Sequence, residues 1–190
     1  MDAASAVFGE KGFHGTQVGE IAARAEVSLA TVYSMFDGKE ELFQAAIETT
    51  AEAIRAEVEG KVAGVPDSRE RILQLIDSLF SCFEQNRDLL RIYSRGTQGL
   101  PWKIRQEMGE SAQQIFHGFS SWVIRLAEQA AADGHLPGIE PQVFALSLIG
   151  SVNTVATHMV ETTPDRALSD LTPAVRAVFA RILDPGGTGS

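Results

Sequence analysis

The sequence predicts an all-α protein, and three observations support this fold class. Apolar residues recur three and four positions apart along nearly the whole chain, the spacing that places them on one face of an α-helix. No segment alternates convincingly between polar and apolar residues with the period of two that is typical of a strand. Turn-forming residues separate the helical stretches, as at Asp37-Gly38 and at Gly64-Val65-Pro66-Asp67. The 190 residues, 44% of them hydrophobic, suffice for a sizeable core in one or two domains.

Four helices are predicted before residue 63. The first carries an apolar stripe that begins at Ala3 and is expected to end at Gly9 and Gly12. Thr16 is expected to cap the second helix and Ser28 the third, because both hydroxyls can accept hydrogen bonds from a first turn. The second, third and fourth helices are predicted over residues 17–25, 29–36 and about 39–62.

The rest of the chain predicts five more helices. Ser68 is expected to cap the next one, which has a strong apolar face up to Phe83. A single long helix is expected to follow Pro101, because proline is well placed in a first turn. The others are predicted over residues 89–93, about 142–160 and about 171–183.

The charge balance argues against a general nucleic-acid coat protein, which needs a basic surface. The net charge is −9. Up to Glu48 the chain has three basic residues against eight acidic ones, a net −5. A sequence-specific DNA-binding protein tolerates such a balance if its few cations face the groove. Here these cations are Lys11, Arg24 and Lys39.

The composition also indicates a cytoplasmic location. The one cysteine, Cys82, has no partner for an intrachain disulfide, and it is expected to be a small buried apolar residue. The first five residues have neither the basic nor the apolar region of a secretory signal. The longest apolar stretch, 143–160, is interrupted by six polar residues, so no membrane partner is expected.

The stretch from Phe13 to Phe43 predicts a helix-turn-helix. Two short capped helices are joined by the few residues around Glu26-Val27-Ser28. Ala22 is small at a position where the two helices must approach closely. The second helix is then free to lie in a major groove, with its N-terminal residues facing base edges. The residues expected to seal the shared core are Ile21, Val27, Val32 and Phe36.

The outward positions of the second of these helices differ in chemistry. Thr31, Tyr33 and Ser34 can form hydrogen bonds with phosphates or bases. Leu29 and Ala30 offer only apolar contact, as to a thymine methyl group.

This stretch resembles the DNA-binding domain of the TetR family of bacterial transcriptional regulators, without a gap over about the first fifty residues. The matching residues are Phe8, Gly12-Phe13, Thr16, Val18, Glu20-Ile21-Ala22, Ala25, Val27-Ser28, Thr31, Val32-Tyr33, Phe36, Lys39-Glu40 and Leu42-Phe43. In such regulators the residues that match Tyr33 and Lys39 touch phosphate. The candidate DNA contacts are therefore Thr16, Gln17, Ser28, Leu29, Ala30, Thr31, Tyr33, Ser34 and Lys39.

Three features depart from the family pattern. Glu26 occupies a turn position where glycine is common, and a positive φ there would cost about 1 kcal/mol. Gly19 and Leu29 occupy positions that are often basic. The basic stretch that commonly precedes the first helix is absent from this sequence.

The resemblance implies a domain organisation. We expect a three-helix helix-turn-helix domain over residues 1–46, a helical effector-binding and dimerisation domain over 47–184, and a disordered tail over 185–190. The last two helices are rich in small and apolar residues and are expected to form a homodimer as a four-helix bundle. Two copies would read a near-palindromic operator in double-stranded DNA.

A small-molecule effector is expected in a mainly apolar cavity of the second domain, although ordinary core packing explains any single aromatic residue as well. The residues expected to line this cavity are Phe80, Phe83, Tyr93, Trp102, Phe116, Phe119, Trp122, Asn153 and His158.

The predicted function is a repressor that is released from its operator by such an effector. In the alternative interpretation, Thr31, Tyr33 and Lys39 are exposed surface residues that contact no ligand. The alternative for the whole chain is a ligand-binding or interaction protein of this fold with weak or lost DNA binding, because the chain up to Glu48 carries a net charge of −5. No cofactor, metal or enzymatic activity is expected, since the sequence has no metal-ligand spacing, nucleophile motif or phosphate loop.

Overall fold

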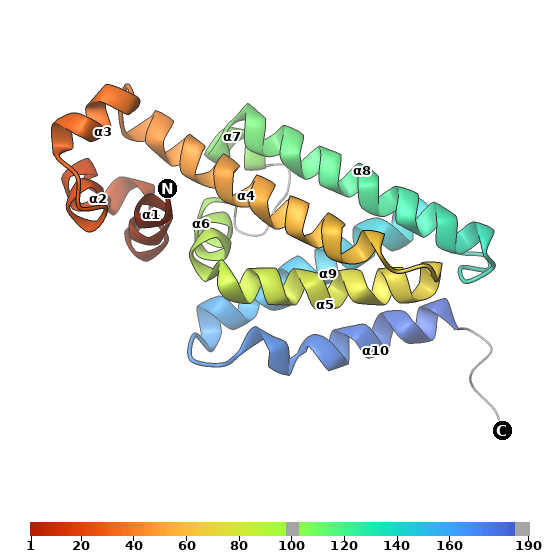
Figure 1. The fold of residues 1–190 in the computed structure, drawn as a ribbon. Helices are drawn as coiled ribbons and strands as arrows, with labels where there is room; N and C mark the ends of the chain where they lie inside the picture. Colours follow the sequence, from red (N-terminus) through yellow and green to blue (C-terminus); the bar gives the residue numbers. More distant parts are fainter. Residues whose placement is uncertain (98–102, 185–190) are drawn as a thin grey trace. The chain divides into compact units, whose positions relative to one another are not determined.

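The computed structural model describes residues 1–97 and 103–184, and every regular element within these ranges is a helix (Figure 1). The prediction of an all-α protein is confirmed. Trp102 and the tail expected over 185–190 lie outside the described residues. The elements are α1 (Asp2–Gly15), α2 (Val18–Arg24), α3 (Leu29–Met35), α4 (Lys39–Ala63), α5 (Ser68–Gln85), α6 (Arg87–Thr97), α7 (Ile104–Met108), α8 (Glu110–Ala132), α9 (Pro141–Thr162), the 3-10 helix η2 (Leu168–Asp170) and α10 (Thr172–Leu183).

The chain forms two compact units. The first takes Met1–Ala53 together with Asn86–Ile115, and the second takes Ile54–Gln85 with the chain from Phe116 onward. The long helices α4 and α8 each contribute residues to both units. Packing therefore groups α6 and α7 with the N-terminal helices. The predicted functional division after residue 46 does not anticipate this grouping.

An aromatic cluster forms the core of the first unit. Phe8 on α1 is fully buried, and its ring meets that of Phe43 on α4 edge-on, with 4.9 Å between centroids. The ring of Phe13 packs against Phe43 at 5.1 Å. These contacts hold α1 against the start of α4, which explains the aromatic residues at those three positions.

The sequence predicted that the first helix ends at Gly9 and Gly12, but the helix continues through Gly9. It continues to a kink at Gly12, which has φ 70° and ψ 172°, and then resumes for its last turn. Gly9 instead allows close packing of α1 against α6. A Cβ atom at Gly9 would lie 2.7 Å from Cβ of Asp88. The glycine therefore serves a tertiary contact and not a helix end.

Two of the three predicted helix caps are wrong. Gln17, not Thr16, caps α2 in a reciprocal capping box with Glu20. Asp67 accepts the backbone N–H of Glu70 at 2.8 Å at the start of α5, where Ser68 is already helical and buried. The cap at Ser28 is confirmed, since its Oγ accepts the Thr31 N–H at 3.0 Å.

The long helix predicted after Pro101 is interrupted. Gly109 adopts φ 93° and separates the short α7 from α8. A left-handed residue cannot continue an α-helix, and glycine adopts this conformation at little cost. The helix α6 is longer than the predicted 89–93, and it packs against α1 within the first unit.

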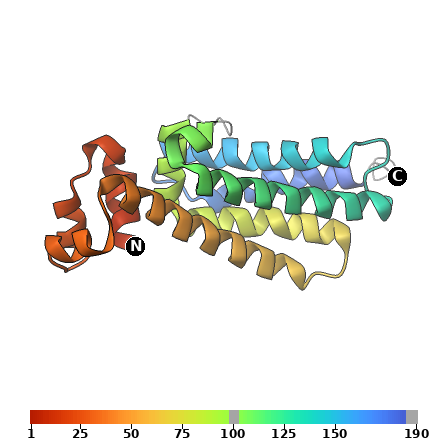
Figure 2. The same ribbon diagram turned by 90° about the horizontal axis from the view of Figure 1, so that it is seen from above.

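In the second unit α5, α9 and α10 pack against one another pairwise (Figures 1 and 2). Phe144 on α9 meets Phe179 on α10 edge-on, with 5.6 Å between ring centroids. Cys82 on α5 is buried, as predicted, and burial raises the pKa of its thiol to about 11. Among the described helices, α9 has the length and apolar composition of a membrane span, but packing in this core accounts for its buried residues.

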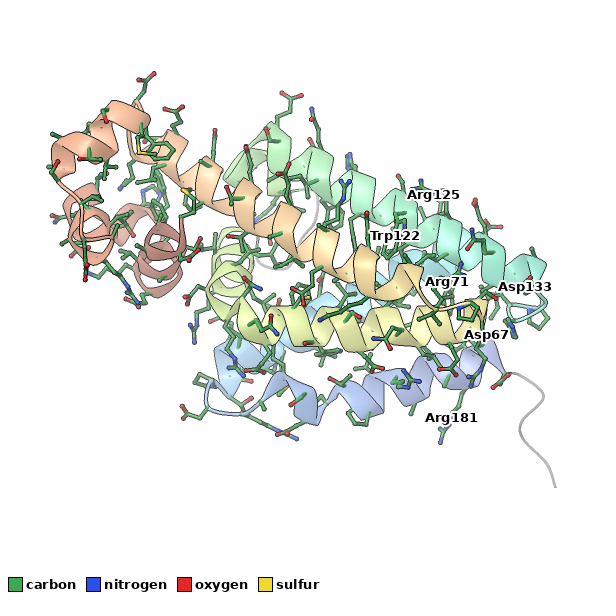
Figure 3. All side chains as sticks on the ribbon, in the orientation of Figure 1. Asp67, Arg71, Trp122, Arg125, Asp133 and Arg181 are labelled. Carbon is green, nitrogen blue, oxygen red and sulfur yellow. The ribbon has the colours of Figure 1, made fainter. Side chains whose placement is uncertain are left out.

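Charged residues tie α10 to α5. Arg176 on α10 donates to Asp77 at 2.5 Å and to Glu70 at 3.0 Å. Arg69 on α5 pairs with Asp184 at 2.7 Å. Arg71, which Figure 3 labels on α5, donates to the Val65 carbonyl at 2.9 Å and to Gln129 of α8 at 2.7 Å. Ion pairs and hydrogen bonds therefore link the helices around the apolar core of the second unit.

We predict that Gly9→Ala destabilises the protein by about 1–3 kcal/mol, because the new methyl group overlaps Cβ of Asp88, which the backbone holds in place. Gly19→Ala is the matched control. Gly19 lies on α2, and no neighbouring atom is within 4 Å of the place that a Cβ atom would take, so alanine should stabilise by about 0.5–1 kcal/mol. Urea unfolding measures both changes, and equal stability of the two variants would contradict the close packing of α1 on α6.

Candidate nucleic-acid interface

The turn between α2 and α3 is a compact, hydrogen-bonded helix end. The Val27 N–H donates to the Ala22 carbonyl at 3.0 Å, and the Glu26 N–H donates to the Ala23 carbonyl at 3.2 Å. This pair of bonds is a Schellman motif, which needs a left-handed residue after the helix. Glu26 supplies it with φ 57°. The positive φ that the sequence suggested for this turn is therefore present at Glu26, and a glutamate adopts it at a cost in free energy.

The shared core of α2 and α3 is smaller than predicted. Ile21, Ala22 and Val32 are buried as expected, with exposed fractions of 3%, 2% and 7%. Val27 was expected in this core but is 42% exposed, because the Schellman turn places it at the surface. Phe36 is half-buried.

The helix α3 presents most of its surface to solvent. Val32 is its buried residue, and the Ser28 cap holds its first turn. Tyr33 is 52% exposed and Leu29 is 45% exposed. The other exposed residues predicted to contact DNA here are Ser28, Ala30, Thr31 and Ser34. The turn and α3 thus bring six predicted contacts onto one surface.

The basic residues of the first three helices are paired. Lys11 donates to Glu20 at 2.6 Å, and Arg24 donates to Glu10 at 2.7 Å. The hydrogen bond from Lys11 lowers the pKa of Glu20 below its usual value. The sequence did not predict these pairs, although the capping position of Glu20 was readable from its spacing to Gln17. A surface with few unpaired cations releases few counterions when it meets a phosphate backbone.

Lys39 is half-buried at the start of α4. Its Nζ donates to the Thr16 carbonyl at 3.1 Å and lies 4.6 Å from the centroid of the Phe13 ring. These contacts fix the ammonium group near the N-terminus of α2. Contact of Lys39 with a phosphate remains a prediction.

Two of the predicted contacts have other roles in this structure. The side chain of Thr16 is buried, 2% exposed, and its hydroxyl donates to the Gly12 carbonyl at 2.8 Å. This burial disagrees with the prediction that Thr16 contacts DNA. Gln17 is exposed, and its side chain takes part in the α2 capping box.

The residues predicted to line an effector cavity do not form one described site. Phe80 is buried at 1% exposure, whereas His158 is exposed. Tyr93 belongs to the first compact unit, and burial raises the pKa of its hydroxyl. The half-buried members in the second unit are Phe83, Phe116, Phe119, Trp122 and Asn153.

Two of these aromatic residues make a pair on α8. The rings of Phe119 and Trp122 lie 5.6 Å apart between centroids, and Figure 3 labels Trp122 on this helix.

A hollow of about 330 Å³ lies elsewhere in the second unit and includes Phe80 of the predicted set. Burial raises the pKa of Asp77 at its edge, and the neighbouring Arg176 opposes this shift. No sequence pattern indicated this hollow, which is lined by Asp77, Phe80, Ser81, Glu84, Gln85, Ser169, Thr172 and Pro173.

Comparison with known proteins identifies the N-terminal domain. Residues 1–46 match the family model described as bacterial regulatory proteins, tetR family. The first 46 of the 190 residues therefore match this family, as the sequence predicted. The match covers the helices α1 to α3 and the start of α4, the part of the chain that presents the exposed α3 surface.

The relatives that the chain resembles are named as regulators of transcription. The HTH-type transcriptional activator FasR of Mycolicibacterium smegmatis is 30% identical over 90 residues, which are 47% of this chain and 41% of FasR. A probable regulator of Bacillus subtilis, YttP, is 30% identical over 50% of this chain. The chain thus spans less than half the length of these two relatives, 41% and 47%. The fatty acid metabolism regulator protein of B. subtilis is 21% identical over 84% of this chain and 81% of its own.

Solved structures share the fold over nearly the whole chain. The fatty acid degradation regulator FadR from Bacillus halodurans has a TM-score of 0.82 at 19% identity, covering 98% of this chain and 93% of its own. FadR from B. subtilis, in complex with stearoyl-CoA, has a TM-score of 0.79 at 20% identity, covering 95% of this chain and 96% of its own. At these identities the likeness concerns the fold alone.

We predict that Glu26→Gly stabilises the protein by about 0.5–1 kcal/mol. Glycine removes the left-handed strain of roughly 1–2 kcal/mol, and its greater freedom in the unfolded chain offsets roughly 0.5–1 kcal/mol of that gain. Glu26→Ala is the control, since it removes the charge but keeps the strained φ of 57°. Urea unfolding of both variants separates strain from charge, and a gain for alanine as large as that for glycine would contradict the explanation.

Proposed function

We propose that the chain is a DNA-binding transcriptional regulator whose dimer binds a near-palindromic operator through α3. The observation that carries this proposal is the outward face of α3 within a domain that matches the TetR family. Tyr33 is the strongest candidate contact, because it combines a hydroxyl group with a side chain that is 52% exposed. A single seven-residue helix reads few bases, so two copies are needed for a specific site. Such a regulator works in the bacterial cytoplasm.

The proposed dimer uses the outward faces of α9 and α10. Three large apolar side chains on these helices are exposed: Val143 at 59%, Leu146 at 46% and Val178 at 56%. Gly150 and Ala177 are small and exposed on the same two helices, which permits close approach of a second copy. An isologous contact between these faces would bury the apolar side chains of both copies.

The proposed regulation is repression that ends when a small, mostly apolar effector binds. The resemblance in fold to FadR bound to stearoyl-CoA, and the relative named for fatty acid metabolism, support an effector with an acyl chain. The half-buried aromatic residues of α8 are suitable for such a ligand. Effector binding would shift the population towards an arrangement in which the two α3 helices no longer fit successive major grooves. The continuous helix α4, which begins at Lys39, would couple the two parts.

A second candidate function is a ligand-binding or interaction protein of this family with weak DNA binding. The pairing of Lys11 with Glu20 and of Arg24 with Glu10 favours it, because both pairs neutralise cations of the helix-turn-helix domain. Asp37, Glu40 and Glu41 lie exposed beside Lys39 and add negative charge next to α3.

Selection of bound sequences from random duplex DNA decides between these functions. We predict enrichment of a near-palindrome, and binding to it at least about tenfold weaker for Tyr33→Ala, because each copy loses a hydrogen bond to a charged phosphate. Met35→Ala is the matched control, since Met35 is 66% exposed at the C-terminal end of α3.

The same duplex tests the proposed regulation. Stearoyl-CoA, as the probe, should release the protein from the enriched duplex in a fluorescence anisotropy titration. A selection without enrichment would overturn the proposed function in favour of the second candidate. An enriched duplex that stearoyl-CoA does not release would overturn an acyl effector alone.

We predict that the double variant Val143→Asp, Val178→Asp is monomeric at micromolar concentration, because each dimer would bury four carboxylates in its apolar contact. Sedimentation should give twice the 20.5 kDa chain mass for the unaltered protein and for Ala132→Asp, an exposed position on α8. Circular dichroism checks that the variants keep their helices. A double variant that still sediments as a dimer would place the interface elsewhere.

A further inference from the structure

The exposed face of α3 lacks the side chains that read bases by paired hydrogen bonds. Its sequence, Leu-Ala-Thr-Val-Tyr-Ser-Met, contains no charged residue and no side-chain amide. Arginine or lysine reads guanine in the major groove, and asparagine or glutamine reads adenine. A helix without these residues must discriminate base pairs by another feature.

The hydroxyl groups of Ser28, Thr31 and Ser34 are largely engaged in local hydrogen bonds. Oγ of Ser28 lies 2.8 Å from Oγ1 of Thr31, and one of these two hydroxyls donates to the other. Oγ of Ser28 also accepts the Thr31 N–H. Ser34 donates its hydroxyl hydrogen to the Thr31 carbonyl at 2.7 Å. Three of the four hydroxyl-bearing residues from 28 to 34 are therefore committed to local bonds, and few donors remain for purine acceptors.

Apolar surface is what α3 offers in their place. Leu29 is 45% exposed and Ala30 is exposed beside it, both in the first turn of the helix. The first turn of a recognition helix is the part that faces base edges in a helix-turn-helix complex. Val32 is buried at 7% exposure, whereas Leu29 and Ala30 both stay at the surface.

We propose that Leu29 and Ala30 determine operator specificity by contacting thymine methyl groups in the major groove. This inference rests on the proposed DNA-binding function. The C5 methyl of thymine is the large apolar group that a base presents there, and guanine, adenine and cytosine carry no methyl group at that edge. Each operator half-site should therefore hold at least one thymine opposite the first turn of α3, with Tyr33 and Lys39 setting the register on the phosphates.

Replacement of thymine by uracil in the selected duplex tests the proposal, because uracil pairs like thymine and lacks only the methyl group. The full-length protein is titrated against duplexes that carry one uracil at a time, read by fluorescence anisotropy. At a contacted position the affinity should fall roughly fourfold in one half-site and roughly fifteenfold in both, the factors expected for one methyl group left in water. Uracil outside the half-sites should change the affinity less than twofold.

Protein variants link the methyl group to its partner. Leu29→Ala should weaken binding to the thymine duplex and reduce the uracil penalty at one position to less than twofold. Met35→Ala, at the other end of α3, should leave that penalty unchanged. Both side chains are exposed, at 45% and 66%, so both variants should keep the fold, which thermal unfolding checks.

The outcomes separate the two claims. If selection enriches no duplex, the proposed function fails, and the inference fails with it. If a duplex is enriched but uracil is tolerated at every position, or if the penalty persists in Leu29→Ala and in Ala30→Gly, DNA binding stands and methyl recognition by these residues is overturned. A loss of affinity at one uracil position that disappears in Leu29→Ala supports the contact between Leu29 and the thymine methyl group.

Discussion

The turn between α2 and α3 fixes which side of α3 meets solvent. At its start the Val27 and Glu26 N–H groups close the end of α2, and at its end Ser28 caps α3. Three residues thus separate a closed helix end from a capped helix start. Burial of Val32 against α2 then sets the rotation of α3. Leu29, Ala30 and Tyr33 remain exposed around this one buried position.

The cost of this turn is local strain at Glu26. Because the Schellman bonds require a left-handed residue, a glycine would satisfy them with less strain than glutamate. The aromatic cluster of Phe8, Phe13 and Phe43 supplies packing that helps to hold the domain together. Lys39 joins this cluster through its contact with the Phe13 ring.

The ion pairs of the first two helices bear on the proposed binding of DNA more than on stability. Two of the three cations up to Glu48 form hydrogen-bonded pairs with neighbouring carboxylates. Exposed pairs of this kind contribute little to stability, because water and salt screen them. They do reduce the positive charge available to a phosphate backbone. The proposed binding of DNA would therefore depend on shape and apolar contacts more than on counterion release.

The sequence by itself determined the helical fold class, the helix-turn-helix and the Ser28 cap, because period and capping are local properties of neighbouring residues. It also identified the outward residues of α3, since Val32 is the apolar position that its spacing turns inward. The tertiary structure decided what depends on distant residues. The packing of Gly9 on Asp88, the burial of Thr16 and the pairing of Lys11 with Glu20 each join separate segments. Gly109 interrupts a predicted helix, and His158 faces solvent, because neither helical spacing nor residue type records which face a neighbouring helix covers.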